Sequence, residues 1–238
     1  MIATVQFGPN TVKYHTPNPI TVNRVKSIWR KEPLTIKWLY TIDRDTVFLD
    51  VGANVGMYTM LAAAQGAQVY SLEAEAKNYA LLKKNCELNH NSVQAFHLGA
   101  WDHTGESEIY IHKQGVGAAL HSVGESVDWN LQPKQSRETQ TVPVTRLDDF
   151  CDQHRIEPTH IKIDVDGMEH RVVGGAEHTL RHCEQILIEL NCRLSEHRDL
   201  IPHIERLGFL LKERSLRTEG TFQNCGEHLF VRRGRQVK

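Results

Sequence analysis

The stretch at residues 47–56, Val-Phe-Leu-Asp-Val-Gly-Ala-Asn-Val-Gly, constrains the fold of this chain more than any other. An apolar run reaches an acid, Asp50, and the chain then turns at Gly52 and Gly56 before a second apolar run, Met57–Ala64. A continuous apolar run is typical of a parallel strand buried on both faces, and glycine permits positive φ or close approach to a ligand. The stretch therefore predicts a buried strand, a tight loop and a helix whose N-terminus faces the loop.

The glycine spacing of this loop differs from that of dinucleotide-binding loops. Those carry Gly-x-Gly-x-x-Gly, whereas residues 52–56 read Gly-Ala-Asn-Val-Gly. Asp50 at the strand tip would repel a pyrophosphate, which is normally held by the positive potential of a helix N-terminus. A ligand with a cationic end fits better, and S-adenosylmethionine (SAM) carries an ammonium and a sulfonium but no phosphate.

A second acid supports this interpretation. Gln68–Glu73 has the pattern of another strand, and its terminal carboxylate lies roughly 20 residues past the loop, where ribose-binding acids occur. A carboxylate at that point suits ribose because it can accept hydrogen bonds from both hydroxyls of a diol. Asp50 and Glu73 together favour SAM over a nucleotide, a nicotinamide cofactor or a purely structural loop.

Strand and helix patterns alternate from residue 47 to residue 207 and predict an α/β fold with a doubly wound, Rossmann-like sheet of seven strands. The expected strands are residues 47–50, 68–73, 93–100, 160–164, 185–191, 209–213 and 228–231. The expected helices are residues 57–64, 76–90, 147–154, 168–182 and 197–207. The segment between the last two strands is too short for a typical helical crossover, so an antiparallel pair is expected there.

Ligands of such sheets bind at the carboxyl ends of the strands. Asp50, Glu73, Ala100, Asp164 and Asn191 are all expected at those ends. Ala100, at the end of the third strand, marks the expected position of an adenine ring.

Two segments outside the alternation are candidates to cover this site. Residues 1–46 are expected to form an extension with a small hairpin and two helices, which begin near Pro19 and Pro33, while residues 47–238 form the main domain. Residues 113–140 are polar and irregular, between short extra strands at 106–111 and 141–144, and we expect them to form a lid or wall facing the substrate.

The amino-acid composition limits the classes of binding partner and the cellular location that we expect. Lys and Arg number 28 against 29 Asp and Glu, which gives no electrostatic case for nucleic acid. The five cysteines are scattered without a Cys-x-x-Cys motif, which favours reduced thiols and a cytoplasmic location. The sequence shows neither a signal-peptide pattern nor an apolar run of membrane-spanning length, so no membrane span is expected. It leaves open whether the chain forms a homo-oligomer.

Taken together, the chain resembles the FkbM family of SAM-dependent methyltransferases. The resemblance runs from about residue 31 to residue 230 and is carried by Lys-Glu-Pro-Leu-Thr-Ile-Lys-Trp at 31–38, Phe-Leu-Asp-Val-Gly-Ala-Asn-Val-Gly-Met-Tyr-Thr at 48–59, Glu73 with Asn78, Tyr79 and Leu82, His121-Ser122, and Lys-Ile-Asp-Val-Asp-Gly-Met-Glu at 162–169 with Gly175-Ala176. The chain departs from many members at Ala74, where they have proline, and at Asp166, where they have glutamate.

The resemblance implies a class I methyltransferase sheet and methyl transfer, most often to a hydroxyl of a sugar, polyketide or other small metabolite. N-methylation of a peptide side-chain amide in natural-product biosynthesis and a non-catalytic SAM-binding module remain alternatives. The strand tips and the loop indicate cofactor contacts at Asp50, Gly52, Ala53, Asn54, Gly56, Glu73, Ala100 and Asp164, and the matched stretches add Glu32, Tyr58, Thr59 and Asn78.

A hydroxyl acceptor must lose a proton, so a base is expected near the transferred methyl group. Asp164 is the first candidate because it ends a strand beside the expected sulfonium, and Asp166, His121 and Glu169 are the others. Asp166 and Glu169 could instead cap the following helix. A rival arrangement places Mg²⁺ on the oxygens of Asp164, Asp166, Glu189 and Asn191.

Overall fold

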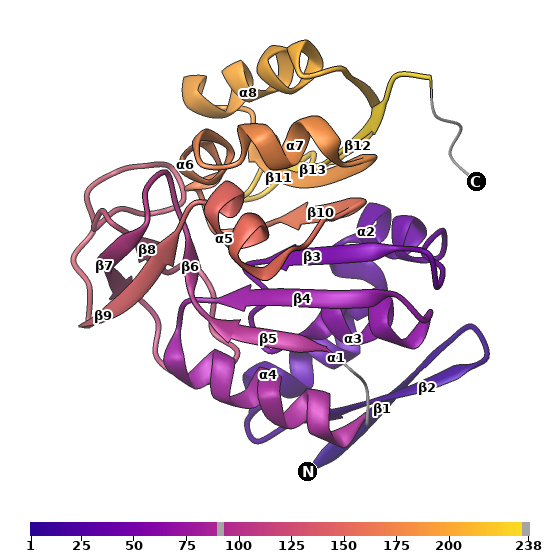
Figure 1. Ribbon diagram of the computed structural model, residues 1–238. Coiled ribbons are helices and arrows are strands. Elements are labelled where there is room, and N and C mark those ends of the chain that lie inside the picture. The colour runs from indigo at the N-terminus through magenta and orange to yellow at the C-terminus, as the bar shows by residue number, and fades with distance from the viewer. Residues whose placement is uncertain (90–92, 235–238) are drawn as a thin grey trace.

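The structure, a computed structural model, describes residues 1–89 and 93–234. The strands of its main sheet are β3 (Val47–Val51), β4 (Gln68–Glu73), β5 (Gln94–His97), β10 (His160–Ile163), β11 (Gln185–Asn191), β12 (Phe209–Leu216) and β13 (Cys225–Arg232). They are arranged in the order β12-β13-β11-β10-β3-β4-β5 (Figure 1). β13 is antiparallel to β11 and β12, and the other neighbours are parallel. The predicted seven-stranded sheet with its antiparallel closing pair is confirmed.

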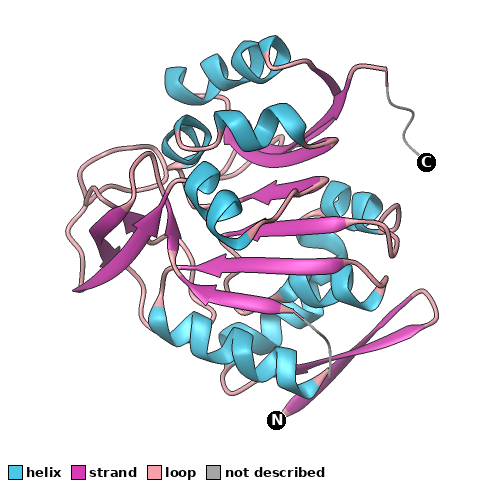
Figure 2. Cartoon of the chain, viewed as in Figure 1, coloured by secondary structure: helices cyan, strands magenta, loops and turns pink. Residues whose placement is uncertain are grey.

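Helices cover both faces of this sheet (Figure 2). They are α1 (Pro19–Lys31), α2 (Pro33–Leu39), α3 (Met57–Ala64), α4 (Ala76–Leu88), α5 (Leu147–His154), α6 (Glu169–Gly174), α7 (Glu177–His182) and α8 (Ser195–Arg206). Side chains alternate along β3, so Phe48 packs with α1 to α4 while Leu49 and Val51 pack with α5 to α8. The expected end of α4 at His90 lies outside the described residues.

The N-terminal extension packs into the first of these cores. Strands β1 (Ile2–Phe7) and β2 (Asn10–His15) form the predicted hairpin, and Asn18 caps α1 through a capping box with Thr21. The Tyr14 hydroxyl donates a hydrogen bond to the Met57 carbonyl at 2.7 Å, which ties the hairpin to the start of α3. No helix in the described part of the chain is long and apolar enough to span a membrane.

The prediction of one continuous strand over residues 93–100 is wrong. The chain leaves the main sheet after β5 and continues as β6 (Gly99–Ala100) in a second sheet with β7 (Gly105–Ile111), β8 (Ser122–Val123) and β9 (Glu138–Thr145), in the order β6-β9-β7-β8. Gly99 permits this crossing, because a Cβ there would lie 3.1 Å from Val144 Cγ1. Ala100 therefore lies where the two sheets meet, and the extra strands expected near 106–111 and 141–144 are β7 and β9.

The helix predicted over residues 168–182 is also divided in two, as α6 and α7. Gly175 separates them and packs directly on the backbone that follows β6, where a Cβ would lie 2.1 Å from the Trp101 carbonyl oxygen. The helical spacing of the apolar residues is correct, but this close backbone contact interrupts the helix. Met168, just before α6, packs with Trp101 in the core of the second sheet.

Adjacent glycines allow a test of that contact. We expect Gly175→Ala to lower the free energy of unfolding by at least about 2 kcal/mol, because overpacking a tight contact typically costs 1–3 kcal/mol or more. Gly174→Ala is the matched control, since its Cβ would lie 3.8 Å from the nearest side-chain atom, Asp102 Cβ, an ordinary contact. Equal urea-denaturation midpoints for the two variants would contradict the packing argument.

Candidate functional site

A cavity, here named the main cavity, opens at the carboxyl ends of β3, β4 and β10, where the two sheets meet. Its empty volume, mouth included, is about 580 Å³. The lining residues are Gly52, Asn54, Leu72, Glu73, Ala74, Asn78, Leu98, Gly99, Ala100, Trp101, Ile109, His121, Val123, Asp164, Val165, Asp166 and Met168. Most predicted site residues therefore gather here, including Glu73, Ala100 and three of the four candidate bases, Asp164, Asp166 and His121.

The loop between β3 and α3 shapes the floor of the main cavity. The amides of Gly52 and Ala53 both donate to the Leu72 carbonyl at 3.0 Å, which holds the loop against the end of β4. Gly52 has φ +81°, and a Cβ there would lie 2.0 Å from the Asp164 carbonyl oxygen. Only glycine fits a positive φ at so close an approach. Gly52, the first glycine of the predicted loop, therefore allows the ends of β3 and β10 to lie in direct contact.

Glu73 ends β4 and faces the main cavity with a carboxylate that is already partly engaged. One oxygen accepts a hydrogen bond from the Asn54 amide at 2.7 Å and the other from the Glu75 amide at 2.8 Å. Burial raises the pKa of Glu73 to about 7 against the effect of these two bonds. A carboxylate has about four acceptor positions, so two remain for donors on a ligand.

Asp50 is placed differently from Glu73. Its buried carboxylate accepts a hydrogen bond from the Thr59 hydroxyl at 2.5 Å, and it does not line the main cavity. Lys162 is its direct neighbour in the pairing of β3 with β10. Burial raises the pKa of Asp50, and the nearby Lys162 charge opposes this.

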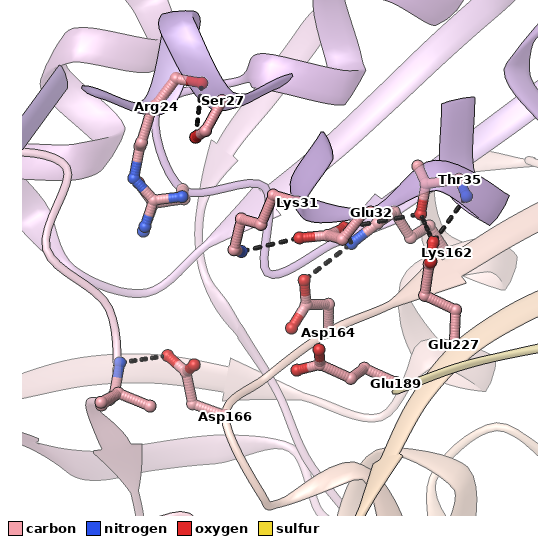
Figure 3. Close-up of polar contacts among 12 residues, drawn as sticks. Arg24, Ser27, Lys31, Glu32, Thr35, Lys162, Asp164, Asp166, Glu189 and Glu227 are labelled. Atoms are coloured by element: carbon pink, nitrogen blue, oxygen red, sulfur yellow. Dashed lines mark hydrogen bonds and ion pairs between the residues drawn. The ribbon is translucent and has the colours of Figure 1, made fainter. Parts of the chain in front are cut away.

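A buried ionic cluster adjoins the cavity beneath the N-terminal helices. The Lys162 ammonium lies 2.8 Å from Asp164 and 3.6 Å from Glu32, and Glu32 also pairs with Lys31 at 2.7 Å. In Figure 3, Lys31 and Arg24 from α1 face the acids at the ends of β10 and β11. The tight pairing with Lys162 outweighs burial and holds the pKa of Asp164 well below its usual range, which makes this carboxylate a weak base.

The extension is attached to the sheet at the same place. Glu227 on β13 accepts hydrogen bonds from the Thr35 hydroxyl and the Thr35 and Leu34 amides at the start of α2. Tyr58 of α3 lies under Lys162, with the ammonium 5.1 Å from its ring centre. Thus Glu32, Tyr58 and Thr59, predicted as cofactor contacts, belong to the network that supports the cavity.

The irregular segment at residues 113–137 closes over the glycine loop. The Ala118 carbonyl accepts hydrogen bonds from the side-chain amides of Asn54 at 2.8 Å and Asn78 at 3.1 Å. The Gly117 amide donates to Asn78 Oδ1 at 2.7 Å, and its carbonyl accepts from Arg24 Nε at 2.6 Å. Asn78 thus binds this segment, residues 113–137, which we call the lid and which was expected to face the substrate. Arg24 of α1 binds the lid as well.

Asp166 occupies the boundary between the main cavity and a second one. Its backbone has φ +58°, an uncommon left-handed conformation for a residue other than glycine. Its Oδ2 accepts a hydrogen bond from the Leu120 amide of the lid at 2.6 Å. Burial, helped by the negative charge of Asp164, raises the pKa of Asp166 to about 6.

The second cavity lies beyond Asp166 and has an empty volume of about 300 Å³. It is lined by Leu120, Trp129, Asp166, Gly167, Glu169, Glu189, Asn191, His197, Phe222 and Cys225. Burial, with the charges of Asp164 and Glu32, raises the pKa of Glu189 to about 8. Glu169 accepts from the Val165 amide at 2.9 Å and contacts His197 at 3.3 Å, so it stabilises the turn before α6.

His121 lines the main cavity, as expected of a candidate base, but it is not paired with the adjacent Ser122. Its Nδ1 is buried and has no hydrogen-bond partner among the described residues. Burial lowers the pKa of His121 to about 4, so the ring is neutral near pH 7. The neighbouring Ser122 hydroxyl contacts His112 Nε2 at 3.2 Å instead.

The oxygens proposed for Mg²⁺ do not converge. Asp164 pairs with Lys162, while Glu189 pairs with Arg217 at 2.9 Å. The Asn191 side-chain amide donates to the Trp129 carbonyl at 3.2 Å. Across residues 1–89 and 93–234, no group of three or more His, Cys, Asp or Glu side chains is arranged to hold a metal ion, so the rival metal arrangement has no support here.

Several residues at the site were not singled out from the sequence. Lys31 and Lys162 lie within the stretches that resemble the FkbM family, but the sequence does not show that Glu32, the neighbour of Lys31 in the chain, also pairs with the distant Lys162. Trp129 and Phe222 are aromatic residues within polar loops. An aromatic side chain in such a loop was the feature of the sequence that could have pointed to them. Nothing in the sequence indicated a role for Arg24 at the site, since a cation on an amphipathic helix is usually solvated.

The chain is similar in sequence to known methyltransferases. The family model for the methyltransferase FkbM domain matches residues 50–211. A curated relative, hexuronic acid methyltransferase AglP of Haloferax volcanii, is 23% identical over 221 residues, which cover 90% of this chain and 83% of that protein.

Solved structures share the fold. The FkbM methyltransferase of Methylobacillus flagellatus KT matches with a TM-score of 0.53 and 18% identity, over 80% of this chain but only 44% of that longer chain. SAM-bound magnesium protoporphyrin IX methyltransferase of Synechocystis PCC 6803 matches with a TM-score of 0.53 and 12% identity, over 92% of this chain and 86% of that one. Because the family model covers residues 50–211 of 238, this chain belongs to the FkbM family of SAM-dependent methyltransferases.

Proposed function

We propose that the protein transfers the methyl group of SAM to a hydroxyl oxygen of a sugar, polyketide or other small metabolite, with Asp166 as the base. The observation that carries this proposal is the position of Asp166, which lines both the main cavity and the second cavity. A base must contact the acceptor while the acceptor meets the methyl donor. The name of the Haloferax relative, a hexuronic acid methyltransferase, favours a sugar among these acceptors.

The residues of the main cavity fit SAM. Glu73 has acceptor positions left for the ribose hydroxyls, and Trp101, Ala100 and Ile109 offer apolar surface for the adenine ring at the sheet junction. Asp164 keeps its negative charge beside the same cavity, which suits a cationic donor. Bound SAM supplies an electrophilic methyl group, so the protein must align the acceptor, exclude water and remove one proton.

Asp166 is better suited to proton removal than Asp164 or His121. The ion pair with Lys162 makes Asp164 a weak base, and His121 is a weak base for a different reason, its burial. A pKa of about 6 leaves Asp166 largely ionised at pH 7 while it retains affinity for a proton. When the acceptor oxygen forms its bond to the methyl carbon and the carbon–sulfur bond breaks, the hydroxyl proton passes to the Asp166 carboxylate.

The cofactor part of the proposal predicts a loss of SAM affinity in Glu73→Gln. Glutamine has one acceptor oxygen with two acceptor positions, and the Asn54 or Glu75 amide would occupy one of them, so at most one remains for the ribose instead of two. We expect the dissociation constant for SAM to rise roughly ten- to a hundred-fold, since a hydrogen bond to a charged group contributes about 1.5–3 kcal/mol. Isothermal titration measures this, with Glu87→Gln on the exposed face of α4 as the control. Unchanged affinity would remove Glu73 from the cofactor site.

The role of Asp166 predicts a pH-dependent rate. The base must be ionised, so kcat/KM should fall about tenfold per pH unit below about 6 and level off above it. Release of S-adenosylhomocysteine with methyl pyranosides and hydroxylated polyketide fragments as acceptors provides the measurement. Asp166→Asn should lower the rate about 10²–10⁴-fold while SAM still binds.

Two controls accompany this experiment. Asp166→Glu keeps a carboxylate at the position where many family members have glutamate, and it should retain far more activity than Asp166→Asn. A chelator should leave the wild-type rate unchanged if the carboxylate acts alone. A flat profile between pH 5 and 8, or an active Asp166→Asn variant, would be incompatible with the assigned base.

A further inference from the structure

The second cavity combines an aromatic wall with a polar rim, and this combination indicates how an acceptor is held. We propose that Trp129 and Phe222 form a platform for one C–H face of a pyranose ring, whose hydroxyls point toward Asp166 and Glu189. This inference rests on the proposed methyl transfer and assigns the residues that orient the acceptor.

The two aromatic rings come from loops that are distant in the sequence. Trp129 lies in the lid and Phe222 in the connection between β12 and β13, yet their ring centres are 4.6 Å apart at an interplanar angle of 48°. Neither residue belongs to the three hydrophobic cores among the described residues. Both line the second cavity instead, so their packing serves the cavity wall.

Two arginines and the neighbouring backbone hold the rings of the platform in place. The Arg193 guanidinium lies 4.5 Å from the Trp129 ring centre, and that of Arg217 lies 5.6 Å from the Phe222 ring centre. The Trp129 carbonyl accepts from Asn191 at the end of β11, and a Cβ at Gly167 would lie 3.2 Å from the Trp129 Cα. The tryptophan backbone is therefore held against the turn that carries Asp166.

The rim of the cavity carries the polar groups that a sugar needs. Glu189 keeps 24% of its side chain exposed while paired with Arg217, and Asp166 lies between this cavity and the methyl donor's cavity. A pyranose has an apolar C–H face and a hydroxylated edge, and ligand sites match such shapes with aromatic walls and a few placed polar groups. A wholly aromatic acceptor would desolvate both acids without hydrogen-bond donors to replace the water, which is costly.

The lid joins the platform to the base. Leu120, whose amide binds Asp166, has φ +68°, and Leu131, just after Trp129, has φ +58°. Left-handed backbone at residues other than glycine is maintained where the surrounding structure demands it. The same lid segment thus sets both the position of the carboxylate and that of the tryptophan, and an acceptor ring on the platform lies next to Asp166.

Saturation-transfer NMR on the SAM-saturated protein tests the platform. The probes are the methyl pyranosides of glucose, galactose, mannose and glucuronic acid, with phenol and acetamide as non-sugar probes. At least one pyranoside should receive saturation mainly on the protons of one ring face. Trp129→Ala and Phe222→Ala should each weaken that pyranoside about tenfold or more, whereas Trp129→Phe should cost about threefold or less, since it keeps an aromatic face.

The controls separate this inference from the proposed function. Trp29→Ala removes a partly exposed tryptophan of α1 that packs on Phe7, and it should leave pyranoside binding unchanged. SAM affinity should be unchanged in Trp129→Ala, whose side chain does not line the main cavity. Failure of the wild type to bind SAM would overturn the proposed function itself. Three outcomes with intact SAM binding would overturn the platform alone. They are no contact with any pyranoside, binding of phenol or acetamide only, and no effect of Trp129→Ala on pyranoside binding.

Discussion

The buried ammonium of Lys162 is the interaction on which the rest of the site depends. Its side chain is 5% exposed at the centre of the main sheet, where an unpaired charge would be very costly. Asp164, Glu32 and Asp50 surround it and raise the pKa of Lys162 far above its usual value, so the lysine stays charged. Removing one partner of such a buried pair typically costs about 3–5 kcal/mol, which makes the cluster sensitive to any single loss.

This cluster joins three parts of the chain. Asp50 comes from β3, Asp164 from the end of β10, and Glu32 from the junction between α1 and α2. Pairing with one lysine therefore fixes the N-terminal helices over the strand ends. The helices in turn hold the lid through Arg24, and the lid donates to Asp166 through the Leu120 amide. The same cluster gives two aspartates different pKa values, because Lys162 lowers the pKa of Asp164, while burial and the charge of Asp164 raise the pKa of Asp166.

The elements that local patterns predicted correctly are those whose residues meet neighbours through regular strand or helix faces. Gln68–Glu73, Met57–Ala64 and Leu147–His154 have the predicted bounds. The two errors, at residues 93–100 and 168–182, both occur at glycines. Gly99 and Gly175 meet Val144 and Trp101, distant residues that a pattern within one segment does not reveal.

The sequence by itself determined the order of strands and helices, the glycine loop after β3 and the placement of the acid Glu73 at the end of β4, because these follow from local periodicity and from the position of an acid at a strand end. Only the tertiary structure decided which acid keeps its charge, which one can take a proton, and which aromatic rings form a wall. Charge state depends on burial and on charges brought from other elements, as Glu32 from the N-terminal helices is brought to Lys162. Such proximity exists only once the chain has folded, since electrostatic interaction falls with distance and depends on the surrounding medium.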